Sequence, residues 1–130
     1  MIATGTFMVT MTPLEDTGIA GGDGAFSLSK TYEGDLAATA TGRMLTAMTE
    51  HKGSQAYVAV EQVTGTLAGR TGEFKLVHRG IMDKGAPTLS VTIVPDSGEG
   101  ELVGISGDLD IQIKEGTHHY VLDYQLPGAS

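Results

Sequence analysis

A carboxylate interrupts an apolar strand face in the middle of the sequence. If residues 55–64 form a strand, Tyr57, Ala59 and Glu61 share one face, because successive side chains point to opposite faces of a strand. If that face lines the inside of a barrel, we expect burial to raise the pKa of Glu61 and to suit its carboxyl group to proton transfer. The alternatives are a solvated charge at a strand end and a buried carboxylate satisfied by backbone amides.

A histidine lies on the apolar face of a second segment. His78 continues the alternating series Phe74 and Leu76, so it points to the same side as these two residues. If the two segments are neighbouring strands, we expect His78 to pair with Glu61 as an acid–base couple. A histidine in this position is equally compatible with a structural role in the core or at its rim.

Tyrosine and methionine side chains are expected to form the wall of such a cup. Tyrosine combines an apolar ring with a polar tip, which is typical of small-ligand pockets, and methionine adapts to irregular shapes. The candidate ligand-binding residues are Tyr57, Tyr120, Tyr124, Met44 and Met48.

No metal site and no cofactor are predicted. His118 and His119 are adjacent, so on a strand they face opposite sides and cannot bind the same ion. The chain has no cysteine, which excludes thiolate ligands and disulfides. No serine has the context of a nucleophile elbow.

These residues need a scaffold of strands. The chain has 19 glycines, each of which weakens a helix interior by about 1 kcal/mol, so long helices are not expected. Several segments between the glycines alternate apolar and polar residues with a period of two. The expected strands span residues 2–11, 25–33, 35–49, 55–64, 72–82, 88–94, 107–114 and 117–126. We predict one all-β domain over residues 1–130, an eight-stranded antiparallel barrel, closed because the strands lack edge protection.

A glycine-rich pattern occurs twice. Residues 65–74 and 100–109 both read Gly-x-Leu-x-Gly-x-(Thr/Ser)-Gly-acid-apolar. A phosphate-binding glycine loop leads from a strand into a helix, whereas a strand is expected to follow each copy here. We therefore expect tight connections, with Leu67 and Leu102 plugging one end of the core.

Charge limits the classes of partner. The formal net charge is −8, and the eight basic residues are scattered singly, so the chain lacks the basic patch that binds nucleic acid or an anionic membrane. The sequence shows neither a signal-peptide pattern nor an apolar run long enough to span a membrane. We expect a cytoplasmic protein.

Three longer runs, residues 53–67, 72–78 and 94–102, resemble a bacterial family of unknown function. The short run 34–36 and the ending 118–126 resemble it too. Members of that family are similar to allene oxide cyclase, a cup of eight antiparallel strands. The resemblance implies such a barrel, a homodimer, and an apolar small molecule bound in the cup.

The leading hypothesis is a small-molecule-binding barrel that acts as a cofactor-free isomerase, cyclase or lyase. Glu61 would be its base or acid, His78 the partner of Glu61, and the tyrosines would orient the ligand. A non-catalytic carrier or sensor of an apolar metabolite is the first alternative. A structural or interaction protein with a filled barrel is the second. A packed interior without a cavity would exclude both ligand-binding hypotheses.

Overall fold

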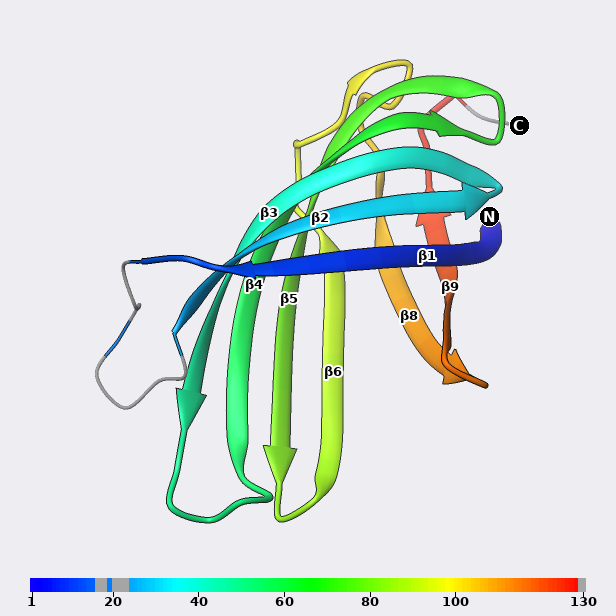
Figure 1. Ribbon diagram of the computed structural model, residues 1–130. Coiled ribbons are helices and arrows are strands. Elements are labelled where there is room, and N and C mark those ends of the chain that lie inside the picture. Colours follow the sequence, from blue (N-terminus) through cyan, green and yellow to red (C-terminus); the bar gives the residue numbers. More distant parts are fainter. Residues whose placement is uncertain (16–18, 20–23, 129–130) are drawn as a thin grey trace.

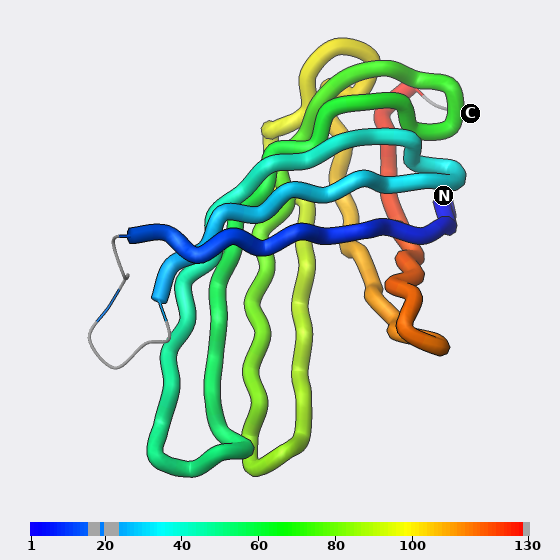
Figure 2. Tube along the Cα trace, viewed as in Figure 1, coloured from blue at the N-terminus to red at the C-terminus, as the bar shows by residue number. Residues whose placement is uncertain are grey.

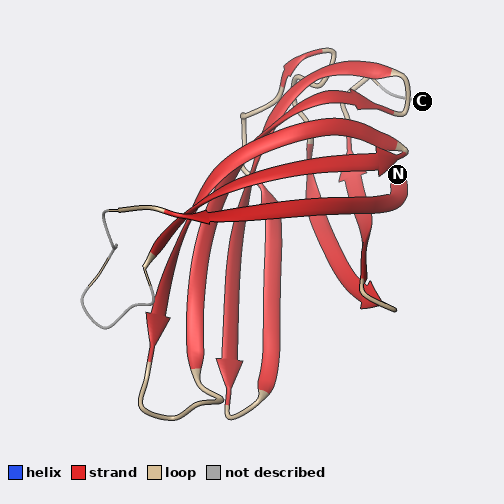
Figure 3. Ribbon diagram, in the orientation of Figure 1, coloured by secondary structure: helices blue, strands red, loops and turns tan. Residues whose placement is uncertain are grey.

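The computed structural model describes residues 1–15, 19 and 24–128. All regular secondary structure in these residues is β-strand (Figure 3). The strands are β1 (Ile2–Pro13), β2 (Ala25–Gly34), β3 (Leu36–Met48), β4 (Gln55–Leu67), β5 (Arg70–Asp83), β6 (Ala86–Ile93), β7 (Glu99–Gly100), β8 (Ser106–Lys114) and β9 (Thr117–Gln125). No helix in this part of the chain is long and apolar enough to cross a membrane.

Eight of these strands close into an antiparallel barrel. The hydrogen-bonded order is β4-β3-β2-β1-β9-β8-β6-β5, and β5 pairs again with β4 (Figure 1). The predicted eight-stranded closed barrel is confirmed. The two-residue strand β7, which pairs with β5, was not predicted because it is too short to show an alternating pattern.

The hairpin turns follow from local sequence. Glu115 and Gly116, between β8 and β9, both have positive φ angles, 51° and 79°. This is the backbone form that joins two antiparallel strands most tightly, and glycine adopts it without strain. Ala68 and Gly69 repeat the arrangement between β4 and β5, with φ angles of 48° and 86°.

One end of the barrel is filled by the core. Leu67 and Leu102, the apolar residues of the two glycine-rich copies, are each 1% exposed, so the predicted plug is confirmed. They pack in a single cluster with the other large side chains of this end, among them Leu36, Ile105, Leu122, Tyr120, Tyr124 and Leu126.

The barrel has a thin seam. Among the described residues β6 and β8 pair at one position, Thr92 with Asp108, and the Thr92 hydroxyl donates to the Asp108 carboxylate over 2.9 Å. Toward the lower end of Figure 2 the traces of β6 and β8 diverge, while β3 to β6 continue as a long curved sheet. The half of the barrel below the core is therefore the more open half.

Candidate functional site

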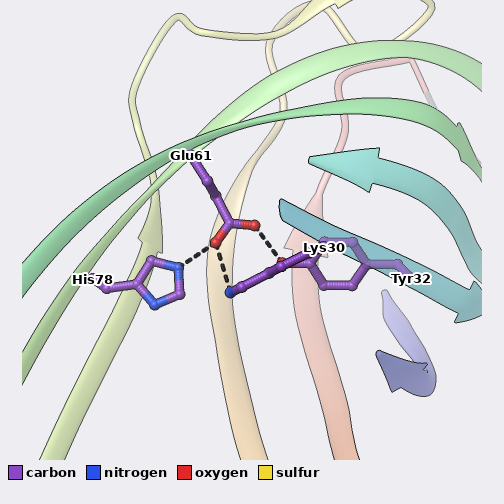
Figure 4. Close-up of polar contacts among 4 residues, drawn as sticks. All are labelled: Lys30, Tyr32, Glu61 and His78. Atoms are coloured by element: carbon purple, nitrogen blue, oxygen red, sulfur yellow. Dashed lines mark hydrogen bonds and ion pairs between the residues drawn. The ribbon is translucent and has the colours of Figure 1, made fainter. Parts of the chain in front are cut away.

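A buried carboxylate gathers three polar side chains inside the barrel. Oε2 of Glu61 lies 2.7 Å from Nζ of Lys30 and 2.6 Å from Nε2 of His78 (Figure 4). The hydroxyl of Tyr32 donates to Oε1 of the same carboxylate. The four side chains are between 1% and 6% exposed. We call Lys30, Tyr32, Glu61 and His78 the Glu61 cluster.

Small residues on β3 allow the Glu61 cluster to form. Lys30 and Tyr32 come from β2, whereas Glu61 comes from β4, so the β2 side chains must reach across β3. In register, Ala40 faces Lys30, and Gly42 faces Glu61. A Cβ atom on Gly42 would lie 3.0 Å from the Cβ of Glu61, closer than side chains normally pack. Large residues at these β3 positions would fill the space that the ammonium group needs.

The carboxylate of Glu61 stays ionised despite its burial. Burial by itself raises the pKa, but the hydrogen bond from His78 and the charge of Lys30 outweigh it and lower the pKa from the ordinary 4.5 to about 2. The sequence-based expectation of a raised pKa is therefore wrong. It considered the desolvation of Glu61 without the cation that offsets it.

The ionised state of Glu61 fixes the hydrogen atom of the imidazole. An ionised carboxylate only accepts hydrogen bonds, so Nε2 of His78 carries the hydrogen. In the neutral ring Nδ1 is then a free acceptor. Nδ1 makes no hydrogen bond with any described residue, and it points away from the Glu61 carboxylate in Figure 4.

Aromatic rings surround the ammonium group of Lys30. Nζ lies 5.0 Å from the ring centroid of Phe7 and 5.9 Å from that of Tyr32, within the range of cation–π attraction. Burial, and then the charge of Glu61, raise the pKa of the Tyr32 hydroxyl, so this hydroxyl keeps its proton. The ion pair of Lys30 and Glu61 therefore lies beside aromatic rings, and the hydroxyl of Tyr32 also holds the carboxylate in place.

The Glu61 cluster borders a pocket in the open half of the barrel. This pocket, which we call the cup, has a volume of about 350 Å³. Its lining residues come from all eight barrel strands: Phe7, Val9, Met11, Leu28, Lys30, Met44, Tyr57, Ala59, His78, Leu89, Ile111, Ile113 and His118. A second pocket, of about 370 Å³, extends toward the β3–β4 and β5–β6 connections and shares Met44, Tyr57 and Leu89 with the cup. A mostly apolar concavity with a few convergent polar groups is the usual form of a small-molecule site.

The structure brings together only part of the residues proposed from sequence. Glu61 and His78 are in contact, and Tyr57 and Met44 line the cup. Met48 lines only the second pocket. Burial, and then the charge of Glu61, raise the pKa of Tyr57.

Two tyrosines lie away from the cup. Tyr120 and Tyr124 belong to the packed core at the filled end. The Tyr120 hydroxyl accepts a hydrogen bond from the backbone N–H of Leu36 and donates to the backbone oxygen of Glu33, each over 2.9 Å. Its hydrogen bonds are therefore structural.

The adjacent histidines face opposite sides, as the strand pattern predicts. His118 lines the cup, with its ring centroid 5.0 Å from that of Phe7. His119 lines a different pocket, beside Gln112 and Lys114. Within the described part of the chain no three histidine, cysteine or acidic residues lie close enough together to hold a metal ion.

Sequence reasoning missed Lys30 and Tyr32. The signal was present, since Leu28, Lys30 and Tyr32 alternate along β2 on one face, and all three are buried. A lysine between two inward-facing apolar residues requires a buried counterion. Glu61, the buried acid of β4, is that counterion.

Fold and site together define a closed antiparallel β-barrel with one filled half and one open half, in which a mostly apolar cup borders a buried ion pair. The family model for "Protein of unknown function (DUF3224)" matches residues 3–124, and the chain belongs to this family. The chain is similar to a DUF3224 family protein of unknown function from Shewanella oneidensis MR-1, whose crystal structure is known and whose sequence is 45% identical to this one. The alignment covers 99% of this chain and 98% of that one, with a TM-score of 0.90. A search of curated proteins found no match.

Proposed function

We propose that the protein binds an apolar small molecule in the cup and acts on it as a cofactor-free isomerase, cyclase or lyase. One observation carries this proposal. His78 is fixed through Nε2 by an ionised carboxylate, and its second ring nitrogen has no partner among the described residues. An imidazole oriented in this way can accept a proton from a bound molecule and return it.

His78 and Glu61 have different roles in this proposal. His78 takes a proton from a carbon of the substrate at Nδ1, and Glu61 stabilises the imidazolium that forms. With a pKa of about 2, Glu61 itself is too weak a base to carry the proton at neutral pH. It is therefore a positioning residue rather than the acid or base proposed from sequence.

The presence of the cup favours a ligand-binding protein over a structural or interaction protein with a filled barrel. Its volume of about 350 Å³ lies in the range of small-molecule pockets. The expected resemblance to allene oxide cyclases is part of this proposal. Those barrels bind apolar small molecules, which is the class of ligand proposed here. A carrier remains the second candidate, because the contacts of Glu61 with Lys30 and His78 stabilise the folded protein whether or not a reaction takes place.

Proton exchange in deuterated water tests the proposal. The protein is incubated with apolar carbon acids (ketones, nitroalkanes and indene), and loss of the acidic C–H signal is followed by NMR. We expect faster exchange of at least one compound, and a loss of about 100-fold or more in His78→Gln. The matched control is His119→Gln, whose side chain lines a different pocket.

The outcomes separate the candidates. Exchange that is equally fast with the wild type and with His78→Gln would contradict the catalytic role. Binding of the same compounds without exchange would favour the carrier. Native mass spectrometry of the purified protein adds a direct search for a copurified apolar molecule.

Oligomeric state and cellular location are separate questions. The homodimer expected from the resemblance stays a prediction, which light scattering on the purified protein tests. The cytoplasmic location also stays a prediction, and cell fractionation tests it.

A further inference from the structure

The cup collects nitrogen-bearing side chains in an acidic protein. The chain has 16 acidic and 8 basic residues, yet Lys30, His78 and His118 all line the cup, and among the described residues no carboxylate lines it. Glu61 lies behind this wall and accepts from two of the three groups. A molecule in the cup therefore meets N–H donors and a ring nitrogen, while the acid is shielded from it.

Lys30 has unused hydrogen-bonding capacity toward the cup. Its ammonium group carries three hydrogens, of which one is donated to Oε2 of Glu61. No other acceptor for them is found among the described residues, and the side chain is only 6% exposed. Buried donors are nearly always satisfied in native proteins, by protein atoms, by water or by a ligand. An oxygen atom of a molecule in the cup, which Lys30 lines, is in a position to accept from these hydrogens.

We propose that the ligand is an apolar molecule with one oxygen that bears negative charge, and that Lys30 binds this oxygen. The charge is either present in the free ligand or develops on a carbonyl oxygen during the reaction. This inference rests on the proposed function, because it assigns the substrate class of the same cup. It makes Lys30 a catalytic residue for carbonyl substrates.

The reaction step balances without a cofactor. The C–H bond next to the carbonyl group breaks, and its proton moves to Nδ1 of His78. The electron pair forms a C=C bond, and the carbonyl electrons move onto oxygen, giving an enolate that the Lys30 ammonium group stabilises. In a β,γ-unsaturated carbonyl compound the charge also reaches the γ carbon, and return of the proton from His78 to that carbon shifts the C=C bond into conjugation and completes an isomerisation. The new charges, one positive on His78 and one negative on oxygen, cancel within the cup.

The charged and titratable groups that line the cup or belong to the Glu61 cluster come from four strands. They are Lys30 and Tyr32 of β2, Tyr57 and Glu61 of β4, His78 of β5 and His118 of β9. Among them Glu61 is the single acid with a low pKa, and its charge is offset by Lys30. Because the ammonium group of Lys30 lines the cup and the carboxylate of Glu61 lies behind it, the end of the ion pair that a ligand meets is the positive one.

A matched pair of probes tests the inference. 4-Nitrophenol and 4-nitrotoluene have the same size, but only the first ionises, and its absorbance reports its ionisation state. We expect 4-nitrophenol to bind as the phenolate, and more tightly than 4-nitrotoluene. Lys30→Met should lower the affinity for the phenolate by about tenfold or more and leave 4-nitrotoluene unchanged. Lys30→Arg should retain the preference, and Lys75→Met, on the outward face of β5, should change nothing.

A second variant covers the case in which Lys30→Met does not fold. Lys30→Met combined with Glu61→Gln removes both charges of the ion pair, so no lone charge stays buried. This double variant should bind 4-nitrotoluene without preferring the phenolate. Two comparisons of affinity then decide: the affinities of the wild type for the two probes, and the affinity for each probe in the wild type against that in the variant.

The failures of the two proposals differ. If 4-nitrotoluene binds and the phenolate binds no better, or if Lys30→Met leaves the phenolate preference intact, this inference is wrong and the cup is still a binding site. If neither probe binds, the proposed function and this inference both fail. In the exchange assay, ketones should lose their acceleration in Lys30→Met; an acceleration that survives rejects Lys30 as the group that stabilises the enolate.

Discussion

The imidazole of His78 donates from Nε2 to the carboxylate of Glu61 over 2.6 Å, and both side chains are at most 3% exposed. The same carboxylate oxygen lies 2.7 Å from Nζ of Lys30. Tyr32 donates to the other oxygen, so the buried carboxylate has three side-chain donors. Removing the carboxylate would leave all three without their acceptor, and the folded state therefore depends on it.

Replacing the carboxylate tests this dependence. Glu61→Gln leaves the Lys30 ammonium group buried without a counterion, so we expect the free energy of unfolding to fall by about 3–5 kcal/mol. Urea denaturation followed by circular dichroism measures it. The matched control is Glu33→Gln on the exposed face of β2, which should change stability by about 0.5 kcal/mol at most. A loss below about 1 kcal/mol in Glu61→Gln would show that the ammonium group is stabilised without this partner.

Stability should also fall in acid because of Glu61. Its folded-state pKa of about 2 lies below the ordinary 4.5, so its contribution is fully present above about pH 4.5 and is lost as the pH falls through 2. The difference corresponds to about 3 kcal/mol, at about 1.4 kcal/mol per pKa unit. Urea denaturation at pH 6 and pH 2 measures it, and comparison with Glu61→Gln separates it from the other carboxylates. If the wild type and Glu61→Gln lost the same free energy of unfolding between pH 6 and pH 2, the acid-dependent loss would not come from Glu61.

The fold could be predicted because its signals are local. Alternation over residues 107–114 and 117–126, joined by Glu115 and Gly116, predicts the last hairpin, and the structure contains it as β8 and β9. The contact between His78 and Glu61 also followed from alternation on neighbouring strands. The lowered pKa of Glu61 could not be predicted in this way, because the side chain of Lys30 reaches the Glu61 carboxylate from β2, across β3. Only the register of three strands places these two side chains together.

The position of a side chain along the barrel axis could not be predicted from the sequence either. Tyr120 and Tyr124 point inward, as alternation on β9 suggests, but lie in the filled half. Tyr57 also points inward and lies in the open half. Alternation tells which face a side chain occupies, whereas strand length and stagger decide which half of the barrel it reaches.

The two core tyrosines should respond differently to loss of the hydroxyl. In Tyr120→Phe the backbone N–H of Leu36 loses its acceptor, so we expect a loss of about 1–3 kcal/mol of stability. The Tyr124 hydroxyl makes no hydrogen bond with the described residues, so Tyr124→Phe should change stability by about 0.5 kcal/mol or less. Thermal and urea denaturation of the pair measure both values. Equal effects in the two variants would remove the structural role assigned to the Tyr120 hydroxyl.

Tyr57 and Gly80 should be strongly coupled. They face each other across β4 and β5, and a Cβ atom on Gly80 would overlap the ring of Tyr57, which therefore packs directly over the glycine backbone. Gly80→Ala must displace the ring of Tyr57, which lines both the cup and the second pocket. We expect this substitution alone to lower stability by about 1–3 kcal/mol.

A double-mutant cycle isolates that contact. In a Tyr57→Ala background the ring is absent, so Gly80→Ala meets no obstacle and should be neutral or stabilising, since alanine restricts the unfolded chain more than glycine does. The expected coupling free energy is about 1–3 kcal/mol, measured by urea denaturation of the four proteins. Additive effects would mean that the ring does not rest on Gly80. In that case other contacts would hold the ring of Tyr57 at the wall that the cup and the second pocket share.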